Sequence, residues 1–324
     1  MRLFPPAALL FLALPGCSGA QTAETNAPMA LERTIVLPGT RGRIDHLAID
    51  LEGQRLFVAE VAQGTVDEVD LRAGKVAARI AGLNRPQGVA WLPAQRELVV
   101  ASDDGSVRFY SADLTPVARL DLGDDADDVR IDPRNGDVVV GFGKGGLAII
   151  DPVSHKLIGR VALPGHPEGF QISGPKAYVN VPADGSIVAA DIDRQQVLAR
   201  WPTGWHRLNF PMAIAVDGRS ITVAYRLLSA LAQVDTATGR TMQVRAICGD
   251  ADDVFLRGRE AITICGAGRV DIAEPGKPEA SVITRKGART GLYVPEIDQL
   301  FVAAPAGQGP AAILEFAFRW DIAR

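Results

Sequence analysis

A unit of about 40 residues recurs seven times along this 324-residue chain and constrains its fold more than any other feature. Each unit reads as an apolar strand, a polar turn, a second apolar strand, a glycine-containing turn and two alternating strands. The residues just before the first strands are His46, Gln87, Asp128, Glu168, Pro211, Asp253 and Thr290, spaced by 41, 41, 40, 43, 42 and 37 residues. Four-stranded units of about 40 to 45 residues are typical of propeller blades. We therefore predict an all-β, seven-bladed β-propeller over residues 31–324.

The ends of the repeat predict how the ring closes. The seventh unit, which starts near Gly287, supplies only three strands. The segment 31–39 (LERTIVLPG), before the first unit, matches final strands such as KLIGRVALPG at 156–165. We expect this N-terminal strand to complete the last blade, which would remove a long unpaired sheet edge.

One repeat carries a family resemblance. The segment 177–204 (AYVNVPADGSIVAADIDRQQVLARWPTG) resembles the YVTN repeat of bacterial surface and periplasmic propellers, the YncE-like family. The segments GRIDHLAID, RPQGVAWLP, GDDADDVRIDP, GHPEGFQI and NFPMAIA resemble one exported branch of it. The resemblance covers about residues 31–318 and implies the propeller fold. It implies no particular reaction, because one fold hosts many functions.

The first residues indicate export. Residues 1–17 (MRLFPPAALLFLALPGC) combine a basic start with an apolar stretch too short for a comfortable membrane span. The segment 14–17 (LPGC) resembles a bacterial lipobox, which implies lipidation of Cys17; cleavage after Ala20 is the alternative. Residues 18–30 read as a polar tether. We expect a periplasmic protein, anchored by lipid to the outer membrane and otherwise free of membrane contact.

An acidic motif appears twice, as GDDADD at 123–128 and as GDADD at 249–253. In a propeller the first strand of every blade starts at the same end of the central channel, so the residues that precede these strands should form a ring around one mouth. We expect the ring and its neighbours to bind a ligand. The candidate ligand-binding residues are His46, Gln87, Asp127, Asp128, His166, Glu168, Asn209, Asp252, Asp253 and Arg289.

Three interpretations of this ring stay open. The carboxylates could be ordinary polar lining that helps to bind a small ligand or a partner. They could be purely structural, because aspartate before a strand also caps turns. They could also hold a divalent metal, calcium or zinc, with His46, Asp128, Glu168 and Asp253 as ligands.

The remaining residues give fewer indications. Cys248 and Cys265 could form a disulfide, which an oxidising compartment favours, or stay as separate buried thiols. We expect Trp91, Trp201 and Trp205 to pack within blades. The stretch GFGKGG at 141–146 lies between two expected strands, and no helix is expected after it, so a phosphate-binding role is not predicted.

Composition excludes some partners. The formal net charge is −4 and no basic, aromatic-rich groove is evident, so we expect no binding of nucleic acid. We expect a monomer that acts as a non-enzymatic binding or scaffold protein for an unidentified small ligand or envelope protein, without a certain cofactor. The alternative is a metal-dependent, lactonase-like hydrolase with the cation in the central funnel.

Overall fold

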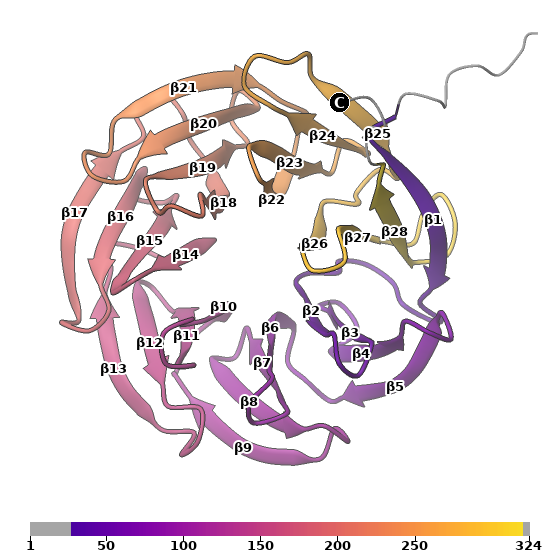
Figure 1. Ribbon diagram of the computed structural model, residues 1–324. Helices are drawn as coiled ribbons and strands as arrows, with labels where there is room; N and C mark the ends of the chain where they lie inside the picture. The colour runs from indigo at the N-terminus through magenta and orange to yellow at the C-terminus, as the bar shows by residue number, and fades with distance from the viewer. Residues whose placement is uncertain (1–26, 320–324) are drawn as a thin grey trace, which may run out of the picture.

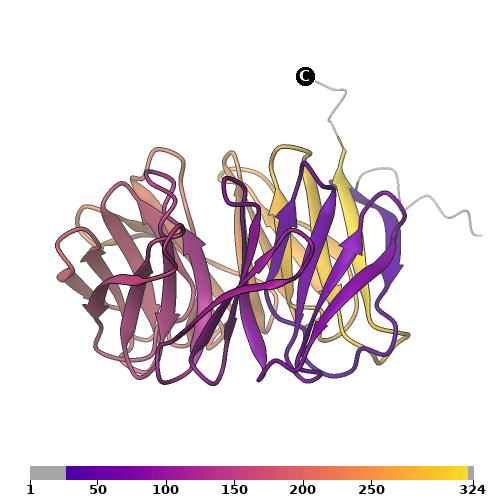
Figure 2. The same ribbon diagram turned by 90° about the horizontal axis from the view of Figure 1, so that it is seen from below.

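The computed structural model describes residues 27–319, which form a ring of seven four-stranded antiparallel sheets (Figure 1). Figure 2 shows the ring edge-on, with the sheets standing side by side around the central axis. The prediction of a seven-bladed propeller is confirmed. The described residues contain only strands, turns and loops, so none of their segments is an apolar helix that could span a membrane.

We number the blades in chain order, with strands given from the channel outwards. Blades 1 to 3 consist of β2 (Leu47–Asp50), β3 (Arg55–Glu60), β4 (Thr65–Asp70) and β5 (Lys75–Ala81); β6 (Pro86–Leu92), β7 (Glu97–Ser102), β8 (Ser106–Ser111) and β9 (Pro116–Asp121); and β10 (Ala126–Ile131), β11 (Val138–Phe142), β12 (Gly146–Ile150) and β13 (Leu157–Ala162).

Blades 4 to 6 follow the same pattern. They consist of β14 (Phe170–Ser173), β15 (Lys176–Val181), β16 (Ser186–Asp191) and β17 (Gln196–Pro202); β18 (Asn209–Ile214), β19 (Ser220–Tyr225), β20 (Ala230–Asp235) and β21 (Thr241–Ala246); and β22 (Ala251–Arg257), β23 (Glu260–Cys265), β24 (Arg269–Ala273) and β25 (Ala280–Ile283).

Blade 7 joins the two ends of the described chain. It consists of β26 (Thr290–Val294), β27 (Gln299–Ala304), β28 (Ala312–Phe318) and, as its outermost strand, β1 (Met29–Val36). Strand β1 runs antiparallel to β28, with Met29 opposite Phe318 and Val36 opposite Ala312. An ion pair of 2.6 Å between Arg33 and Glu315 also links the two strands. The last blade is therefore completed by the N-terminal strand.

The core is divided into seven apolar layers, one between each pair of neighbouring blades. Both faces of a blade are covered by neighbours, which is why the second and third strands are apolar almost throughout. Between blades 1 and 2, for example, the rings of Phe57 and Trp91 stack with their centroids 5.5 Å apart. Packing of this kind fixes the positions of the first strands, which lie nearest the channel in Figure 1.

The first strands of four blades carry a β-bulge where they begin. The strand register shifts between Pro86 and Val89, Ala126 and Val129, Asn209 and Met212, and Ala251 and Asp253. A bulge breaks the alternation of side-chain directions and re-aims the residues inside it. The acidic motifs of blades 3 and 6 both fall in such bulges, so their neighbouring aspartates can point to different partners.

Candidate functional site

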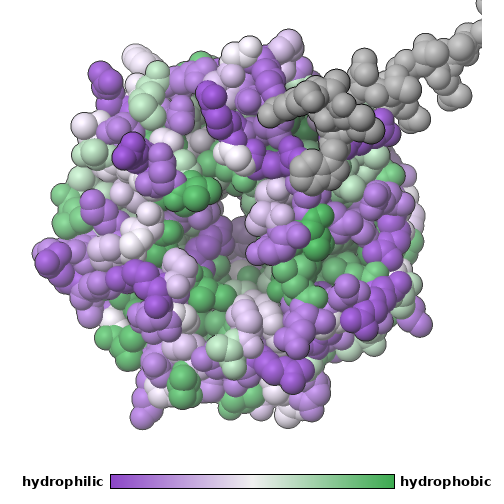
Figure 3. Space-filling model, in the orientation of Figure 1, coloured by the Kyte–Doolittle hydropathy of each residue, from purple (hydrophilic) through white to green (hydrophobic). Residues whose placement is uncertain are grey.

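A narrow cavity of about 50 Å³ lies at the channel mouth. Figure 3 shows the opening at the centre of the ring. The charged residues of its wall are five acids and three bases: Asp45, Asp127, Glu168, Asp252 and Asp253 against Arg43, His46 and Arg130. A buried water needs about 10–15 Å³, so the cavity has room for a few water-sized groups and not for a drug-sized ligand.

The two acidic motifs fold alike, although they lie in different blades. Asp125 and Asp250 take positive φ angles of 23° and 61°, in a region that aspartate tolerates better than most residues. Each also uses its carbonyl oxygen to accept the backbone N–H of a glycine that follows the second strand, Gly143 or Gly266. The aspartate before the alanine of each motif therefore shapes the turn before the strand.

The last aspartate of each motif connects its blade to the next one. The Asp128 carboxylate accepts the Phe170 backbone N–H at 3.3 Å, and the Asp253 carboxylate accepts the Gly291 backbone N–H at 2.7 Å. Asp128 also forms an ion pair with Arg130. The preceding aspartates, Asp127 and Asp252, line the cavity, and Asp253 does so as well. The last aspartate of each motif thus holds neighbouring blades together, and the aspartate before it faces the channel.

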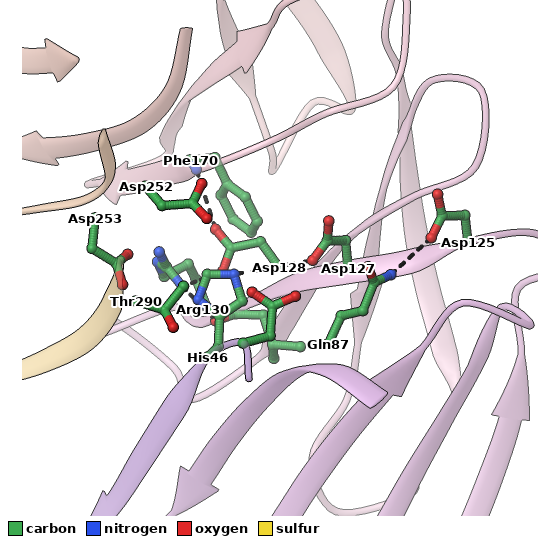
Figure 4. A network of polar contacts seen from close by, with 12 residues as sticks. His46, Gln87, Asp125, Asp127, Asp128, Arg130, Phe170, Asp252, Asp253 and Thr290 are labelled. Carbon is green, nitrogen blue, oxygen red and sulfur yellow. Dashed lines mark hydrogen bonds and ion pairs between the residues drawn. The ribbon is translucent and has the colours of Figure 1, made fainter. Parts of the chain in front are cut away.

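His46 lies among these carboxylates (Figure 4). Burial lowers its pKa, but the negative charges of Asp128, Asp45, Asp253 and Asp127 outweigh burial and raise the pKa to about 9. Its Nε2 atom is 4.0 Å from a carboxylate oxygen of Asp127. The imidazole is therefore a cation at neutral pH, and it is suited to stabilise negative charge rather than to accept a proton.

Three carboxyl groups of the cavity have raised pKa values, so they are protonated to a larger extent at neutral pH than ordinary carboxyl groups. Burial, together with Asp127 and Asp252, raises the pKa of Glu168 to about 8 against the opposing charges of His166 and Arg226. Burial also raises the pKa values of Asp45 and Asp253 to about 7. At pH 7 Glu168 is mostly protonated, because burial disfavours its charged form and the neighbouring carboxylates add to this effect.

Asp127 behaves in the opposite way. Burial raises its pKa, but the imidazoles of His166 and His46 and the guanidinium of Arg43 hold the pKa below its ordinary value. The Nε2 atom of His166 is 4.0 Å from Asp127, and its Nδ1 atom is 2.6 Å from the carbonyl oxygen of Gly143. His166 has its pKa raised to about 9 by these acceptors against the effect of burial. Asp127 is therefore a lasting negative charge on the wall.

The other predicted residues surround the cavity without forming its wall. The Gln87 amide donates to the Asp125 carboxylate at 2.9 Å (Figure 4). Arg289 and Arg226 engage Asp252 and Asp250 from the rim. Asn209, expected at the mouth, is fully buried between blades 4 and 5. Its amide donates at 2.9 Å to the Asn180 side chain and to the carbonyl of Ser186, so its contacts are structural.

The four predicted metal ligands do not form a coordination group. Within residues 27–319, no three His, Cys, Asp or Glu side chains are arranged so that they could hold a metal ion. The carboxylates of Asp128 and Asp253 already accept backbone N–H groups, and Arg130 pairs with Asp128. The geometry therefore does not support the calcium or zinc site.

Sequence reasoning missed two cations of the wall. Arg130 lies two residues after Asp128 in β10, so the alternation of a strand places it on the same side. Arg43 pairs with Asp45 at 2.6 Å from the loop before β2. The alternation signal could have identified Arg130. No repeat feature distinguishes Arg43 from the other residues of its loop.

Cys248 and Cys265 form a disulfide within blade 6, which resolves the two alternatives left by the sequence. Cys248 lies in the loop before β22, and Cys265 is the last residue of β23. Both are buried at the mouth end of the blade. The bridge therefore fixes the loop that carries Asp250 and Asp252.

An apolar patch lies beside the mouth on blade 5. It consists of Trp205, Leu208, Leu227 and Leu228, all exposed. The expectation that Trp205 packs within a blade is wrong, because 89% of it is accessible. Leu227 donates its backbone N–H to Arg207, which joins the two loops of the patch. Arg226, the preceding residue, reaches Asp252. The patch and the charged mouth are thus neighbours on one surface.

Searches against protein-family profiles and against curated proteins found no match to this chain. The fold and the geometry of the mouth therefore carry the functional argument. They define the protein as a seven-bladed β-propeller with a charged channel mouth.

Proposed function

We propose that the protein is a non-enzymatic binding protein of the bacterial cell envelope, whose channel mouth receives a positively charged side chain from a partner protein. The fold is compatible with a binding or scaffold role. The resemblance of residues 177–204 to YVTN repeats supports a place among exported YncE-like propellers.

Glu168 carries the proposal. Its side chain lines the cavity and makes no hydrogen bond or ion pair with the described residues. Burial is the main cause that raises its pKa to about 8, and the charges of His166 and Arg226 offset this effect only in part. A guanidinium or ammonium group placed beside it would let it ionise and would gain a short, charge-assisted hydrogen bond. The small volume of the cavity fits the head group of one side chain.

The apolar patch favours a protein as the source of that cation. Trp205 and Leu228 are 89% and 69% accessible and lie next to the mouth. Exposed tryptophans are enriched among the residues that dominate protein–protein binding energy. A partner segment with one basic residue flanked by apolar residues would satisfy the cavity and the patch together.

Two further features support the envelope location and the absence of catalysis. The export-like residues 1–17 and the Cys248–Cys265 disulfide both suit an oxidising compartment outside the cytoplasm. Catalysis by a hydroxyl nucleophile would need an activated hydroxyl in the cavity wall. Among the residues that line the cavity, Thr290 has the hydroxyl group, and it donates to the carbonyl of Ile44. A hydroxyl that donates to a backbone carbonyl is not activated as a nucleophile by that contact.

Calorimetry with a matched peptide pair tests the proposal. One peptide carries an arginine between leucines, and the other carries citrulline, the neutral isostere, at the same position. At pH 7.5 about three quarters of Glu168 is protonated, so binding of the arginine peptide should release about three quarters of a proton. Titrations in buffers of different ionisation enthalpy measure this proton.

The variant Glu168→Gln provides the control, because it keeps the size of the side chain and removes the proton. It should abolish proton release and weaken the arginine peptide about tenfold. Trp205→Ala should weaken both peptides equally. Equal affinity of wild-type protein for the arginine and citrulline peptides would contradict the proposal.

A further inference from the structure

The layer between blades 5 and 6 differs from the other six. At the position of Phe57 in blade 1, the equivalent residues are Val99, Val139, Tyr178, Ile262 and Phe301 in five other blades, all buried in the layer that follows. Blade 5 has Thr222 at this position. The facing residue of blade 6 is Ala261, where blades 1, 2 and 7 have leucine. Blade 4 also has an alanine, Ala177, at the facing position, but there it faces Val139; only between blades 5 and 6 does a hydroxyl face a methyl group.

The composition of this layer shows the same deficit. Its buried apolar residues include Ala213, Ala224, Ala251 and Ala261, together with the two disulfide cysteines. Each of the other six layers contains at least one buried Phe, Tyr or Trp, whereas this one contains none among the described residues. The sheets are fixed by their inner strands, so the missing side-chain volume remains as space.

That space is a cavity of about 780 Å³. It lies between β18–β21 and β22–β25, which are neighbours in Figure 1. The β18–β19 and β22–β23 turns line it, so it opens on the face opposite the channel mouth. Sites for small molecules typically measure about 300–1,000 Å³, and this cavity falls within that range.

The cavity wall has an apolar part and a polar part. Leu231, Leu256 and Ala261 supply apolar surface. Thr222, Gln233 and Gln243 form one polar row, because they are paired across three adjacent strands. Blades 2 and 3 have Phe109 and Ile149 where blade 5 has Gln233, so the amide is not a requirement of the fold.

Arg259 places a positive charge at the rim of the cavity. It lies in the exposed β22–β23 turn and makes no hydrogen bond or ion pair with another described residue. The other arginine of the wall, Arg245, lies 3.9 Å from Glu279. The wall also holds one acid, Asp217, whose carboxylate accepts the Arg219 backbone N–H. The guanidinium of Arg259 is left to meet a ligand with a carboxylate at one end and an apolar body.

We propose that the hollow between blades 5 and 6 is a second binding site, which takes a small monocarboxylic acid with an apolar body. The apolar body lies against Leu231, Leu256 and Ala261, and the amides of Gln233 and Gln243 and the hydroxyl of Thr222 orient it. The carboxylate meets Arg259. This site is independent of the channel mouth.

Octanoate and its neutral analogue octanamide are the probes, added to the full chain and followed by calorimetry and by NMR. Octanoate should bind saturably with one site per chain and at least tenfold more tightly than octanamide. The side-chain amide signals of Gln233 and Gln243 should shift on binding. Arg259→Gln should remove the preference for octanoate and leave the affinity for octanamide unchanged.

Thr222→Phe fills the hollow with the residue type that blades 1 and 7 have at this position, and it should abolish binding of both probes. Should that variant fail to fold, Thr222→Val, as in blades 2 and 3, removes the hydroxyl and should weaken both probes severalfold. Glu168→Gln, on the opposite face, should bind octanoate like the wild type. Absence of saturable octanoate binding, equal affinity for octanamide, or undiminished binding to Thr222→Phe would each overturn the proposal.

Discussion

Removal of the Cys248–Cys265 disulfide should destabilise the propeller by an amount that follows from the length of the loop it closes. The two cysteines are 17 residues apart. In the chain-entropy description, closing a loop of this length lowers the entropy of the unfolded chain, which corresponds to about 3 kcal/mol at 25 °C. The unfolding entropy is about 2.1 cal/mol/K per residue near 60 °C, or roughly 0.6 kcal/mol/K for this ring. The expected fall in melting temperature is therefore about 5 °C.

Differential scanning calorimetry of a Cys248→Ala, Cys265→Ala double variant tests this value. Cys17 is replaced by serine in both proteins, so that they differ only in the bridged pair. Reduction of the native bridge is the less useful perturbation, because both sulfurs are buried. A melting temperature within 1 °C of the parent would refute the chain-entropy reasoning. A much larger fall would show that the cysteines act mainly through packing in the thin layer between blades 5 and 6.

Three further predictions concern the mouth and its surroundings. Stability should decrease as pH rises from 6.5 to 8, because folded Glu168 and His46, with pKa values of about 8 and 9, keep protons that the unfolded chain releases. Each group changes the free energy of unfolding by up to about 1.4 kcal/mol per pH unit, which urea denaturation at several pH values measures. Glu168→Gln should reduce the slope of stability against pH, and a wild-type stability that does not change with pH would contradict the pKa assignments. Asp253→Ala should lower the free energy of unfolding by about 1–3 kcal/mol, because a buried N–H of blade 7 loses its acceptor; an unchanged urea midpoint would show that this bridge contributes nothing. Trp205→Ala should change the free energy of unfolding by less than about 0.5 kcal/mol and Trp91→Ala should lower it by about 3–5 kcal/mol, because of the two only Trp91 is buried. Thermal melts of the two variants measure this difference, and a similar loss in both would contradict the exposed position of Trp205.

The repeat made the architecture predictable. Strand alternation, the period and the position of the N-terminal strand depend on local sequence, and each blade repeats the same solution. The ring of residues at the mouth followed from that topology. His46, Asp127, Glu168, Asp252 and Asp253 accordingly line one cavity.

The different contacts made by neighbouring aspartates were not predictable. Asp127 faces the channel and Asp128 faces the next blade because a bulge interrupts the strand between Ala126 and Val129. Strict alternation places Asp127 and Asp128 on opposite faces of the strand, but it does not determine which of the two faces the channel. Asn209 was misplaced for a related reason, since its position at a bulge turns its amide inward to Asn180.

The hollow between blades 5 and 6 could be recognised only by comparing equivalent residues of the seven blades, and the strand register defines which residues are equivalent. Thr222 is unremarkable within its own strand. Its significance arises only when the six equivalent residues are known to fill their layers.

The pairing of β1 with β28 also sets the direction in which the molecule would stand on a surface. Strand β1 ends beside the mouth, where the chain continues to Asp45, so Met29 and its neighbour Phe318 lie on the other side of the disc. The proposed N-terminal anchor would join the disc on the side where the hollow beside Arg259 opens, with the acidic mouth on the opposite face.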